Sequence, residues 1–397
     1  MSKIKGLFFS EWQSIFKNPS MISVLLVVPI LYFTLFGNLY SEKKVMEIPV
    51  VVVDSDHSEI SRELIRAFDV DATFAISAIV PSEDEAMKVI DKGSAYVGLI
   101  IPAGLAEKAK SGKEAEVLTI IDGSNMMISN TAVRAANTLI KSISAGVTLK
   151  KLEAKGEWGE DGKNFFTGID YRYRVLYNPT FSYLSFMVFG LGGTVLQQVL
   201  FLGVALAVAR EKDLGTWHKT VRSYSFFQLV LGKLTPYFIL STFNLIVTFT
   251  MVLKWFQVPY YGNPAYLILA GTLFNIAVLS IGFAISYVTK DQLQATQLAM
   301  LIAVPSFMLS GFTWPLMSMP AVIAGIGKSL PLTYFLHAVR EVLTKGHGLE
   351  AIRTDLAVLM LMAVIGLFLA YLAYLLQSRK FATKADAEET GVVVTQA

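Results

Sequence analysis

The residues Gly327-Lys328-Ser329 have the types and order of the phosphate-binding end of a P-loop, Gly-x-x-x-x-Gly-Lys-Ser/Thr. In that motif the first glycine permits the tight turn around the phosphates, a buried strand precedes the loop and a helix follows it. Here Val322 occupies the position of the first glycine, "WPLMSMP" stands where the strand should be, and Pro331 follows almost at once. We therefore interpret the match as accidental and predict that this stretch binds no ATP.

No other group of residues has the pattern of a reaction centre. The chain has no cysteine, which excludes disulfides, thiolate metal sites and cysteine nucleophiles. Asp54 and Asp122 each follow a predicted strand, where Asp before Ser or Gly is usually part of a turn. We expect no catalytic residue, no metal site and no cofactor bound by this chain, and a net charge of +3 gives no reason to expect nucleic-acid binding.

The composition indicates a membrane protein. Hydrophobic residues make up 54% of the chain and charged residues only 16%, against about 25% charged in soluble proteins. Runs of about 20 apolar residues cover the roughly 30 Å of bilayer hydrocarbon as helices. Six runs free of Asp, Glu, Lys and Arg meet this length and predict six transmembrane helices near Ser20–Leu39, Phe181–Ala209, Leu234–Leu253, Ala265–Val288, Leu293–Phe312 and Leu356–Leu376.

The segments around the first span predict an interfacial helix and an orientation. In "KIKGLFFSEWQSIF" the residues Ile4, Leu7, Phe8, Trp12, Ile15 and Phe16 share one helical face, whereas Glu11 falls mainly elsewhere. This pattern favours a helix lying along the membrane surface, with a packed cytosolic helix as the alternative. Lys and Arg are concentrated in the short loops on the N-terminal side of the membrane, so both termini are predicted to be cytoplasmic.

A large insert, residues 41–178, has the composition of a soluble α/β domain and should lie outside the cytoplasm. "IPVVVVD", "AYVGLIIP" and "EVLTIIDG" read as strands, and Ser58 and Ser82 as N-caps of two helices. A long helix is predicted from about Ser129 to Lys155, followed by the polar loop "KGEWGEDGKN". The sequence thus predicts four parts: 1–40 (interface helix and first span), 41–178, 179–380 (five further spans) and a disordered cytosolic tail, 381–397.

Two loops of the membrane part carry the functional hypotheses. Residues 312–346 are apolar but interrupted by Pro315, Pro320 and Pro331, which predicts a re-entrant hairpin rather than one spanning helix. Arg340, Glu341 and His337 in it could be an ion-pair cluster, a substrate contact or interfacial residues. The charged, amphipathic loop 209–225 could dock a soluble partner or be an ordinary positive loop.

At these loops the sequence resembles the permeases of ABC-2-type transporters. "REKDLGTW" is similar to their coupling-helix motif E-x-x-x-G-T, with Glu211, Gly215 and Thr216 in place, although the acidic residue that often follows is replaced here by Trp217-His218-Lys219. "PLTYFLHAVREVLTKG" resembles their re-entrant signature before the last span. The N-terminal helix and the insert resemble those of the drug- and lipid-exporting branch, so the likeness covers essentially the whole chain.

The resemblance implies a bacterial inner-membrane permease without its own ATPase. Two permease copies, identical or paralogous, would pair, and separate ATPase subunits that use ATP and Mg²⁺ would dock on the coupling helix. The contact would include Glu211, Gly215 and Thr216, with Lys212, Trp217 and Arg222 beside them. A periplasmic adaptor and membrane lipid are further expected partners.

The uncharged spans favour an ATP-driven exporter of an amphiphilic, drug-like or lipid-like substrate, because ion-coupled transporters usually carry ionisable groups within their spans. The polar candidates for the pathway are Gln197, Gln198, Asn244, Asn275 and Gln297, and helix–helix hydrogen bonding is the favoured interpretation of them. The alternative function is an envelope receptor or scaffold that binds a partner through its extracytoplasmic domain and transports nothing.

Overall fold

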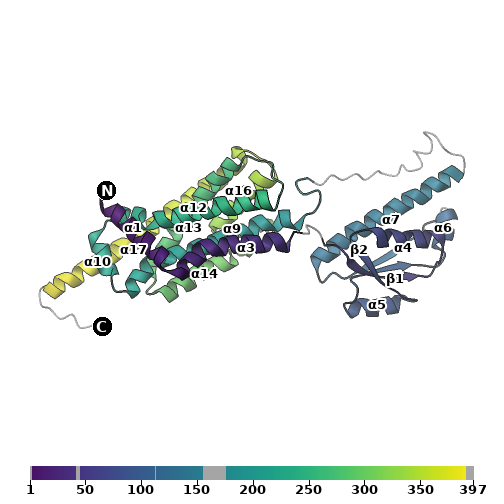
Figure 1. Ribbon diagram of the computed structural model, residues 1–397, viewed down its shortest axis with the longest axis horizontal. Helices are drawn as coiled ribbons and strands as arrows, with labels where there is room; N and C mark the ends of the chain where they lie inside the picture. The colour runs from purple at the N-terminus through teal and green to yellow at the C-terminus, as the bar shows by residue number, and fades with distance from the viewer. Residues whose placement is uncertain (1, 42–44, 112, 155–175, 390–397) are drawn as a thin grey trace. The chain divides into compact units, whose positions relative to one another are not determined.

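A computed structural model describes residues 2–41, 45–111, 113–154 and 176–389 of the protein (Figure 1). The chain forms two compact units. One unit comprises Met1–Ser41 with Leu176–Ala397, and the other comprises Glu42–Val175. The second unit is the insert predicted from the sequence, and each unit has a hydrophobic core of its own.

The insert is built on a four-stranded sheet in the order β2-β1-β3-β4. The strands are β1 (Ile48–Asp54), β2 (Phe74–Ile79), β3 (Val97–Ile101) and β4 (Leu118–Ile121). β1 is parallel to both of its neighbours, with Val50 opposite Val97, and β4 is antiparallel to β3. The buried run of valines in β1 is typical of a strand covered on both faces.

Helices cover both faces of this sheet. Val50 and Val52 pack with α4 (Glu59–Val70), α6 (Leu105–Ser111) and α7 (Met126–Ala154), whereas Val51 and Val53 pack with α5 (Glu83–Asp91). Ser58 and Ser82 cap α4 and α5 as predicted, each accepting from the backbone N–H three residues on. The sequence interpretation missed β2 and α6, and "KGEWGEDGKN" lies outside the described residues.

The membrane unit is entirely helical over its described residues. It begins with α1 (Ser2–Lys17), α2 (Pro19–Ile22), η1 (Ser23–Val27) and α3 (Val28–Leu39). After the insert follow α9 (Tyr183–Asp213), α10 (Trp217–Ser223), α11 (Phe226–Leu229), η2 (Val230–Leu234), α12 (Thr235–Thr250), η3 (Met251–Trp255), α13 (Pro264–Val288), α14 (Gln292–Leu309), η4 (Leu316–Ser318), α15 (Ala321–Lys328), α16 (Pro331–Val339), η5 (Arg340–Thr344) and α17 (Leu349–Glu389).

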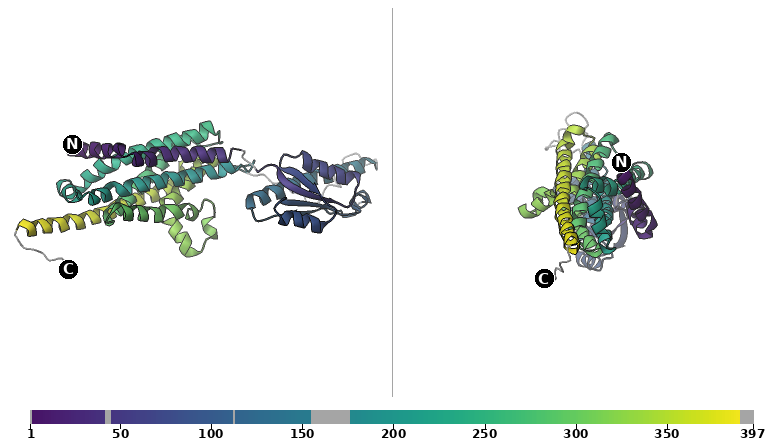
Figure 2. Two further views of the ribbon diagram at one scale, coloured as in Figure 1. Left: turned by 60° about the horizontal axis from the view of Figure 1, so that its bottom comes forward. Right: turned by 90° about the vertical axis from the view of Figure 1, so that its left-hand side faces the viewer.

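Six helical stretches of the described chain are long and apolar enough to cross a membrane, and the bent pair α15 with α16–η5 would be a seventh. The stretches correspond to the six predicted spans. The pair is bent by 79° at Ser329-Leu330, next to Pro331, a break that a re-entrant hairpin and a broken span would both have, so the hairpin stays a prediction. α1 and the far end of α17 lie at one end of this unit, together with α10, and the hairpin lies at the other end (Figures 1 and 2).

α9 is the central helix, because it packs against α3, α12, α13, α14 and α16. Its glycines permit this: a Cβ on Gly192 would lie within 2.1 Å of the Phe33 ring, and one on Gly190 within 2.4 Å of the Phe312 ring. Small residues at helix interfaces let backbones approach closely, which is the usual way to pack helices where lipid supplies no hydrophobic driving force.

Four short segments of the membrane unit have π-helical hydrogen bonding: η1, η2, η3 and η5. A π turn holds one residue more than an α turn and leaves backbone groups open to other partners. The carbonyl of Leu25 in η1, for example, accepts a hydrogen bond from the side-chain amide of Asn244 in α12.

Three details differ from the sequence interpretation. The third span begins at Phe226 rather than Leu234, so Lys233 lies inside a helical run and not in a loop. Glu11, expected away from the apolar face of the first helix, is buried together with Leu7 and Ile15. α17 continues to Glu389, so the first part of the tail that was predicted to be disordered is helical.

Candidate functional site: a buried charge network beside an exposed turn

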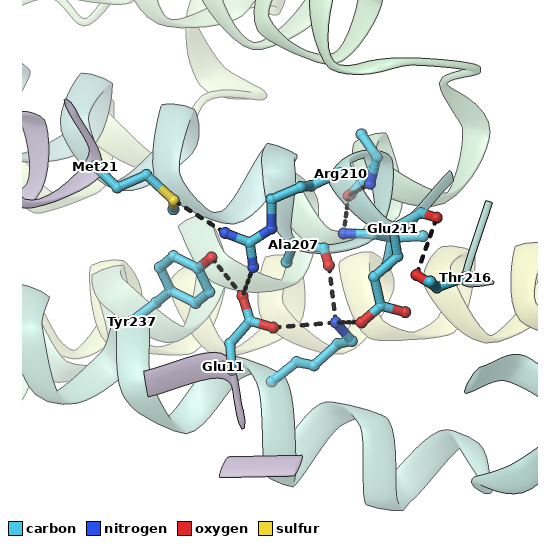
Figure 3. A network of polar contacts seen from close by, with 11 residues as sticks. Glu11, Met21, Ala207, Arg210, Glu211, Thr216 and Tyr237 are labelled. Atoms are coloured by element: carbon cyan, nitrogen blue, oxygen red, sulfur yellow. Dashed lines mark hydrogen bonds and ion pairs between the residues drawn. The ribbon is translucent and has the colours of Figure 1, made fainter. Parts of the chain in front are cut away.

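Four charged side chains meet inside the membrane unit near the end of α9 (Figure 3). The Lys233 ammonium lies 3.1 Å from Glu11 Oε2 and 2.5 Å from Glu211 Oε1, and it also donates to the Ala207 carbonyl at 2.9 Å. Arg210 donates to the other oxygen of Glu11 at 3.0 Å. Two carboxylates and two cations therefore alternate in one connected network.

The network joins three segments that are far apart in the sequence. Glu11 comes from the middle of α1, where Leu7 and Ile15, one turn to either side, are buried on the same face. Arg210 and Glu211 belong to the last turn of α9, and Lys233 belongs to η2. Tyr237, one turn beyond Lys233, donates its hydroxyl to Glu11 at 2.9 Å. A displacement of any one segment would break contacts to the other two.

The two charges at the centre of the network are buried, so the loss of either one would be costly. Lys233 is 1% exposed and Glu11 is 4% exposed, so neither charge is solvated by water. Removing one partner from a buried ion pair typically costs about 3–5 kcal/mol, because the other charge remains buried without compensation. The network is therefore a strong constraint on how α1, α9 and η2 sit together.

The turn that follows the network is exposed. α9 ends at Asp213, Gly215 adopts the left-handed conformation with φ +66°, and α10 begins at Trp217. A residue with a side chain is strained at such a φ, which explains the glycine of the E-x-x-x-G-T pattern. The exposed side chains on this turn and on α10 are Asp213, Leu214, Thr216, His218, Lys219, Arg222 and Ser223, and we call them the α9–α10 tip.

The buried Trp217 and the half-buried Lys212 hold the tip to the core. The Trp217 indole is 2% exposed and donates Nε1–H to Gln377 Oε1 of α17 at 2.6 Å. Gln377 in turn donates to the Tyr287 carbonyl at 2.5 Å, near the end of α13. The Lys212 ammonium donates to the carbonyls of Tyr287 and Thr289 at 2.5 and 2.6 Å, which satisfies backbone groups that the end of α13 leaves open.

The predicted contact residues thus fall into two groups. Glu211, Lys212 and Trp217 point inward and anchor the turn, whereas Gly215, Thr216 and Arg222 are exposed. The sequence interpretation missed Glu11, Lys233 and Gln377. A Lys beside a long apolar run was a usable signal for Lys233, but nothing local to α1 or α17 distinguishes Glu11 or Gln377.

The predicted pathway residues do not come together as one polar surface. Gln197 is fully buried, and neither atom of its side-chain amide has a hydrogen-bond partner among the described residues. Asn244 donates to the Leu25 carbonyl, which agrees with a role in helix packing, and Asn275 is buried in α13. Gln198 is half-buried and Gln297 is exposed on α14.

The prolines of the hairpin stand where the sequence interpretation expects helix breaks. Pro315 and Pro320 directly precede η4 and α15, and Pro331 is the first residue of α16. Pro is tolerated at these positions because the first N–H groups of a helix have no partner within it. Pro315 and Pro320 are exposed, while Pro331 is buried.

A second charge cluster lies where the hairpin meets the start of α17, and we call it the hairpin cluster: His337, Glu341, Lys345, His347 and Asp355. Glu341 lies 2.5 Å from the Lys345 ammonium and 2.6 Å from His347 Nδ1. His337 contacts Asp355 at 2.8 Å and Glu341 at 3.6 Å. Despite these histidines and carboxylates, no group of them in the described chain has the geometry of a metal site.

Arg340 is not the ion-pair partner of its neighbour Glu341. Its guanidinium instead lies over the Phe312 ring, 4.4 Å from the centroid, and donates to the Phe312 carbonyl at 2.9 Å. Of the alternatives that the sequence left open, the ion-pair cluster is present for Glu341 and His337, and Arg340 is not part of it.

A family model described as "ABC-2 family transporter protein" matches residues 19–372, a range that includes the hairpin cluster, the α9–α10 tip and every charged residue of the buried network except Glu11. The chain belongs to the ABC-2 transporter family. This membership agrees with the resemblance seen in the sequence, and with six candidate spans and an inserted α/β domain.

Curated relatives of this ABC-2 family member are also transport proteins. The chain is 24% identical over 351 residues to "Probable multidrug ABC transporter permease YbhR" of Escherichia coli K12, covering 88% of this chain and 92% of the relative. It is 26% identical to the corresponding YbhS protein, covering 87% and 89%. It is 22% identical over 394 residues to "Linearmycin resistance permease protein LnrN" of Bacillus subtilis, covering 94% and 97%. The chain is thus a multi-pass membrane protein of an ABC permease family.

Proposed function

We propose that this protein is the membrane subunit of an ATP-driven exporter, and that a separate ATPase subunit drives it by docking on the α9–α10 tip. The observation that carries the proposal is the contrast within one short turn. The tip exposes Leu214, which is 69% exposed, together with basic residues, while Glu211 and Trp217 on either side are bound into the core. An exposed apolar side chain among charges suits a protein contact.

The side chains that anchor the α9–α10 tip also define the route by which a displacement of the tip would reach the membrane spans. Through Glu211, the turn is connected to Lys233 of η2 and to Glu11 of α1. Through Trp217 and Lys212, it is connected to α17 and α13. A rigid connection to four elements fits a part that carries the movement of a closing ATPase pair into the membrane, with ATP and Mg²⁺ bound by the partner.

The proposed cargo is an amphiphilic, drug-like or lipid-like molecule, moved out of the cytoplasm or the inner leaflet. The apolar spans support this class, and the relatives are named for multidrug transport and for linearmycin resistance. Two copies, or this chain with a paralogue, would form the pathway. Both termini would be cytoplasmic, with residues 41–178 outside in a bacterial inner membrane, where they could meet a periplasmic adaptor.

Substitutions of exposed residues in the α9–α10 tip test whether an ATPase subunit docks there. We expect Leu214→Glu and Arg222→Glu each to reduce co-purification with the ATPase, and the permease-dependent ATPase rate, at least tenfold, since loss of a central interface contact is worth about 2 kcal/mol or more. Both residues are exposed, so the variants should fold normally. Arg353→Glu, an exposed change on α17 at the hairpin end, is the matched control and should have no effect.

Two outcomes would count against the proposal in different ways. If both tip variants keep full complex formation and coupled ATPase activity, the docking position is wrong. If no ATPase co-purifies with the wild-type chain from its own membranes, and none is encoded beside the gene, the receptor or scaffold alternative is favoured instead.

A further inference from the structure

Two cavities of the membrane unit share one wall, made of Arg340 and Phe312. The smaller has a volume of about 180 Å³ and lies on the α9 side, between Phe186, Phe189 and Thr344. The larger has a volume of about 480 Å³ and lies between the hairpin and the start of α17. Its volume is within the range of pockets that hold small ligands, roughly 300–1,000 Å³.

The charge of Arg340 is not neutralised by a carboxylate. Among the described residues no carboxylate forms an ion pair with its guanidinium, although Glu341 is next to it in the chain. The nearby acids are already engaged: Asp355 by His337, and Glu341 by Lys345 and His347. The Phe312 ring and carbonyl stabilise Arg340 by a cation–π contact and one hydrogen bond, which leaves other N–H groups of its fork for a ligand.

The larger cavity combines this cation with apolar walls. Phe312, Pro315, Leu316, Met317 and Leu336 supply carbon surface. The ionisable groups that line it are Arg340, Lys328, His337 and Asp355. Because Asp355 is bound to His337, the charge left to face a ligand is positive. Guanidinium binds planar oxyanions such as phosphate with paired hydrogen bonds, which an ammonium cannot match.

We propose that this cavity binds a membrane phospholipid with an anionic head group, with its phosphate at Arg340 and the upper part of its acyl chains against the apolar wall. Charge complementarity selects the anionic head group. The carbon surface selects a lipid over a soluble anion, since a free phosphate would leave Leu316, Met317 and Pro315 without a partner. The site is at the end of the unit opposite the α9–α10 tip, and the proposal does not depend on the docking of an ATPase.

Binding to the purified full-length chain in detergent tests the site directly. Dioleoyl-phosphatidylglycerol and dioleoyl-phosphatidylcholine, which differ in head-group charge, are titrated and bound lipid is counted by native mass spectrometry. We expect phosphatidylglycerol to bind at least tenfold more tightly. Arg340→Gln should remove this preference, and Arg353→Gln, which deletes an exposed positive charge that lines neither cavity, should keep it.

A second variant separates binding from folding, because Arg340 also holds the Phe312 carbonyl. Ala351 is exposed and lines the larger cavity, so Ala351→Trp fills that space while leaving Arg340 in place. It should weaken phosphatidylglycerol binding at least tenfold with an unchanged melting temperature.

The proposal is overturned if the two lipids bind equally to the wild type, or if Ala351→Trp binds phosphatidylglycerol as the wild type does. It is also overturned if millimolar inorganic phosphate displaces the lipid completely, because the cavity would then be a site for a soluble anion. Loss of the head-group preference in Arg340→Gln, together with weak binding in Ala351→Trp, supports it.

Discussion

The two charge clusters of the membrane unit are built from similar residues but behave differently. In the network near the end of α9, Lys233 is 1% exposed and contacts Glu11 and Glu211, which come from two other helices. In the hairpin cluster, Lys345 is 31% exposed and contacts Glu341 one turn away on the same segment. The first cluster joins distant parts of the chain inside the protein, and the second joins the hairpin to the start of α17, with its carboxylates buried and its cations partly exposed.

Their separation agrees with opposite faces of a membrane. Gln377, which binds the α9–α10 anchor Trp217, and Asp355 of the hairpin cluster are both on α17. The 22 residues between them span about 33 Å at 1.5 Å per residue, comparable with the hydrocarbon thickness of a bilayer. Similar charges therefore differ in the exposure of their cations: Lys233 is enclosed at one end, whereas His337, Lys345 and His347 reach water at the other.

Of the tests that compare the two clusters, replacing the lysine of each should give the largest difference in stability. Lys233→Met leaves the buried Glu11 and the half-buried Glu211 without their shared cation, and we expect it to lower the free energy of unfolding by about 3–5 kcal/mol. Lys345→Met removes a partly exposed charge, and the buried Glu341 keeps His347 as a partner, so this change should cost only about 1 kcal/mol. Melting temperatures of the purified variants in the same detergent measure both. Equal losses would show that the clusters do not differ as described.

A double-mutant cycle should show a smaller but more specific effect. Glu11→Gln and Lys233→Gln together should be less destabilising than the sum of the two single changes by about 1–3 kcal/mol, because each single change leaves a buried charge unpaired. The same cycle on Glu341 and Lys345 should give a coupling of about 0.2–1 kcal/mol. A coupling near zero for the first pair would contradict the geometry of the network.

Salt should produce the smallest effect. At 1 M ionic strength the Debye length is about 3 Å, so exposed pairs are screened while buried ones are not. The stability difference between wild type and Lys345→Met should therefore nearly vanish between 0.1 M and 1 M NaCl, and that of Lys233→Met should persist. Thermal melts at the two salt concentrations decide this, and a salt-sensitive Lys233→Met would indicate that water reaches the network.

The elements of this protein follow closely from local sequence signals. Apolar runs of span length, Ser N-caps and prolines identify the membrane helices, two helices of the insert and the hairpin, because each signal acts within a few residues. The strand that the sequence interpretation missed also has a local explanation. β2 (Phe74–Ile79) is short and incompletely buried, so its apolar pattern is faint.

The candidate site was only half predictable, for a different reason. Glu211, Gly215 and Thr216 lie in a short motif and could be recognised together. Glu11 could not, because its partners Arg210 and Lys233 are about 200 residues away and it resembles any polar residue of a surface helix. Which way Trp217 points also depends on α17. The roles of Glu11 and Trp217 depend on contacts between segments that are far apart in the chain, and no short stretch of sequence reveals such contacts.

The π turns have a consequence for how relatives should be aligned. A π turn arises when a helix gains one residue within a turn, and everything beyond it is then rotated by about 100° about the helix axis. Lys233 lies in one such segment, and Arg340 and Glu341 lie in another. A relative with an ordinary helix at either place is one residue shorter there. Ungapped alignment would then pair each of these charges with the neighbour of its true counterpart, and a difference in helix phase would be read as a substitution.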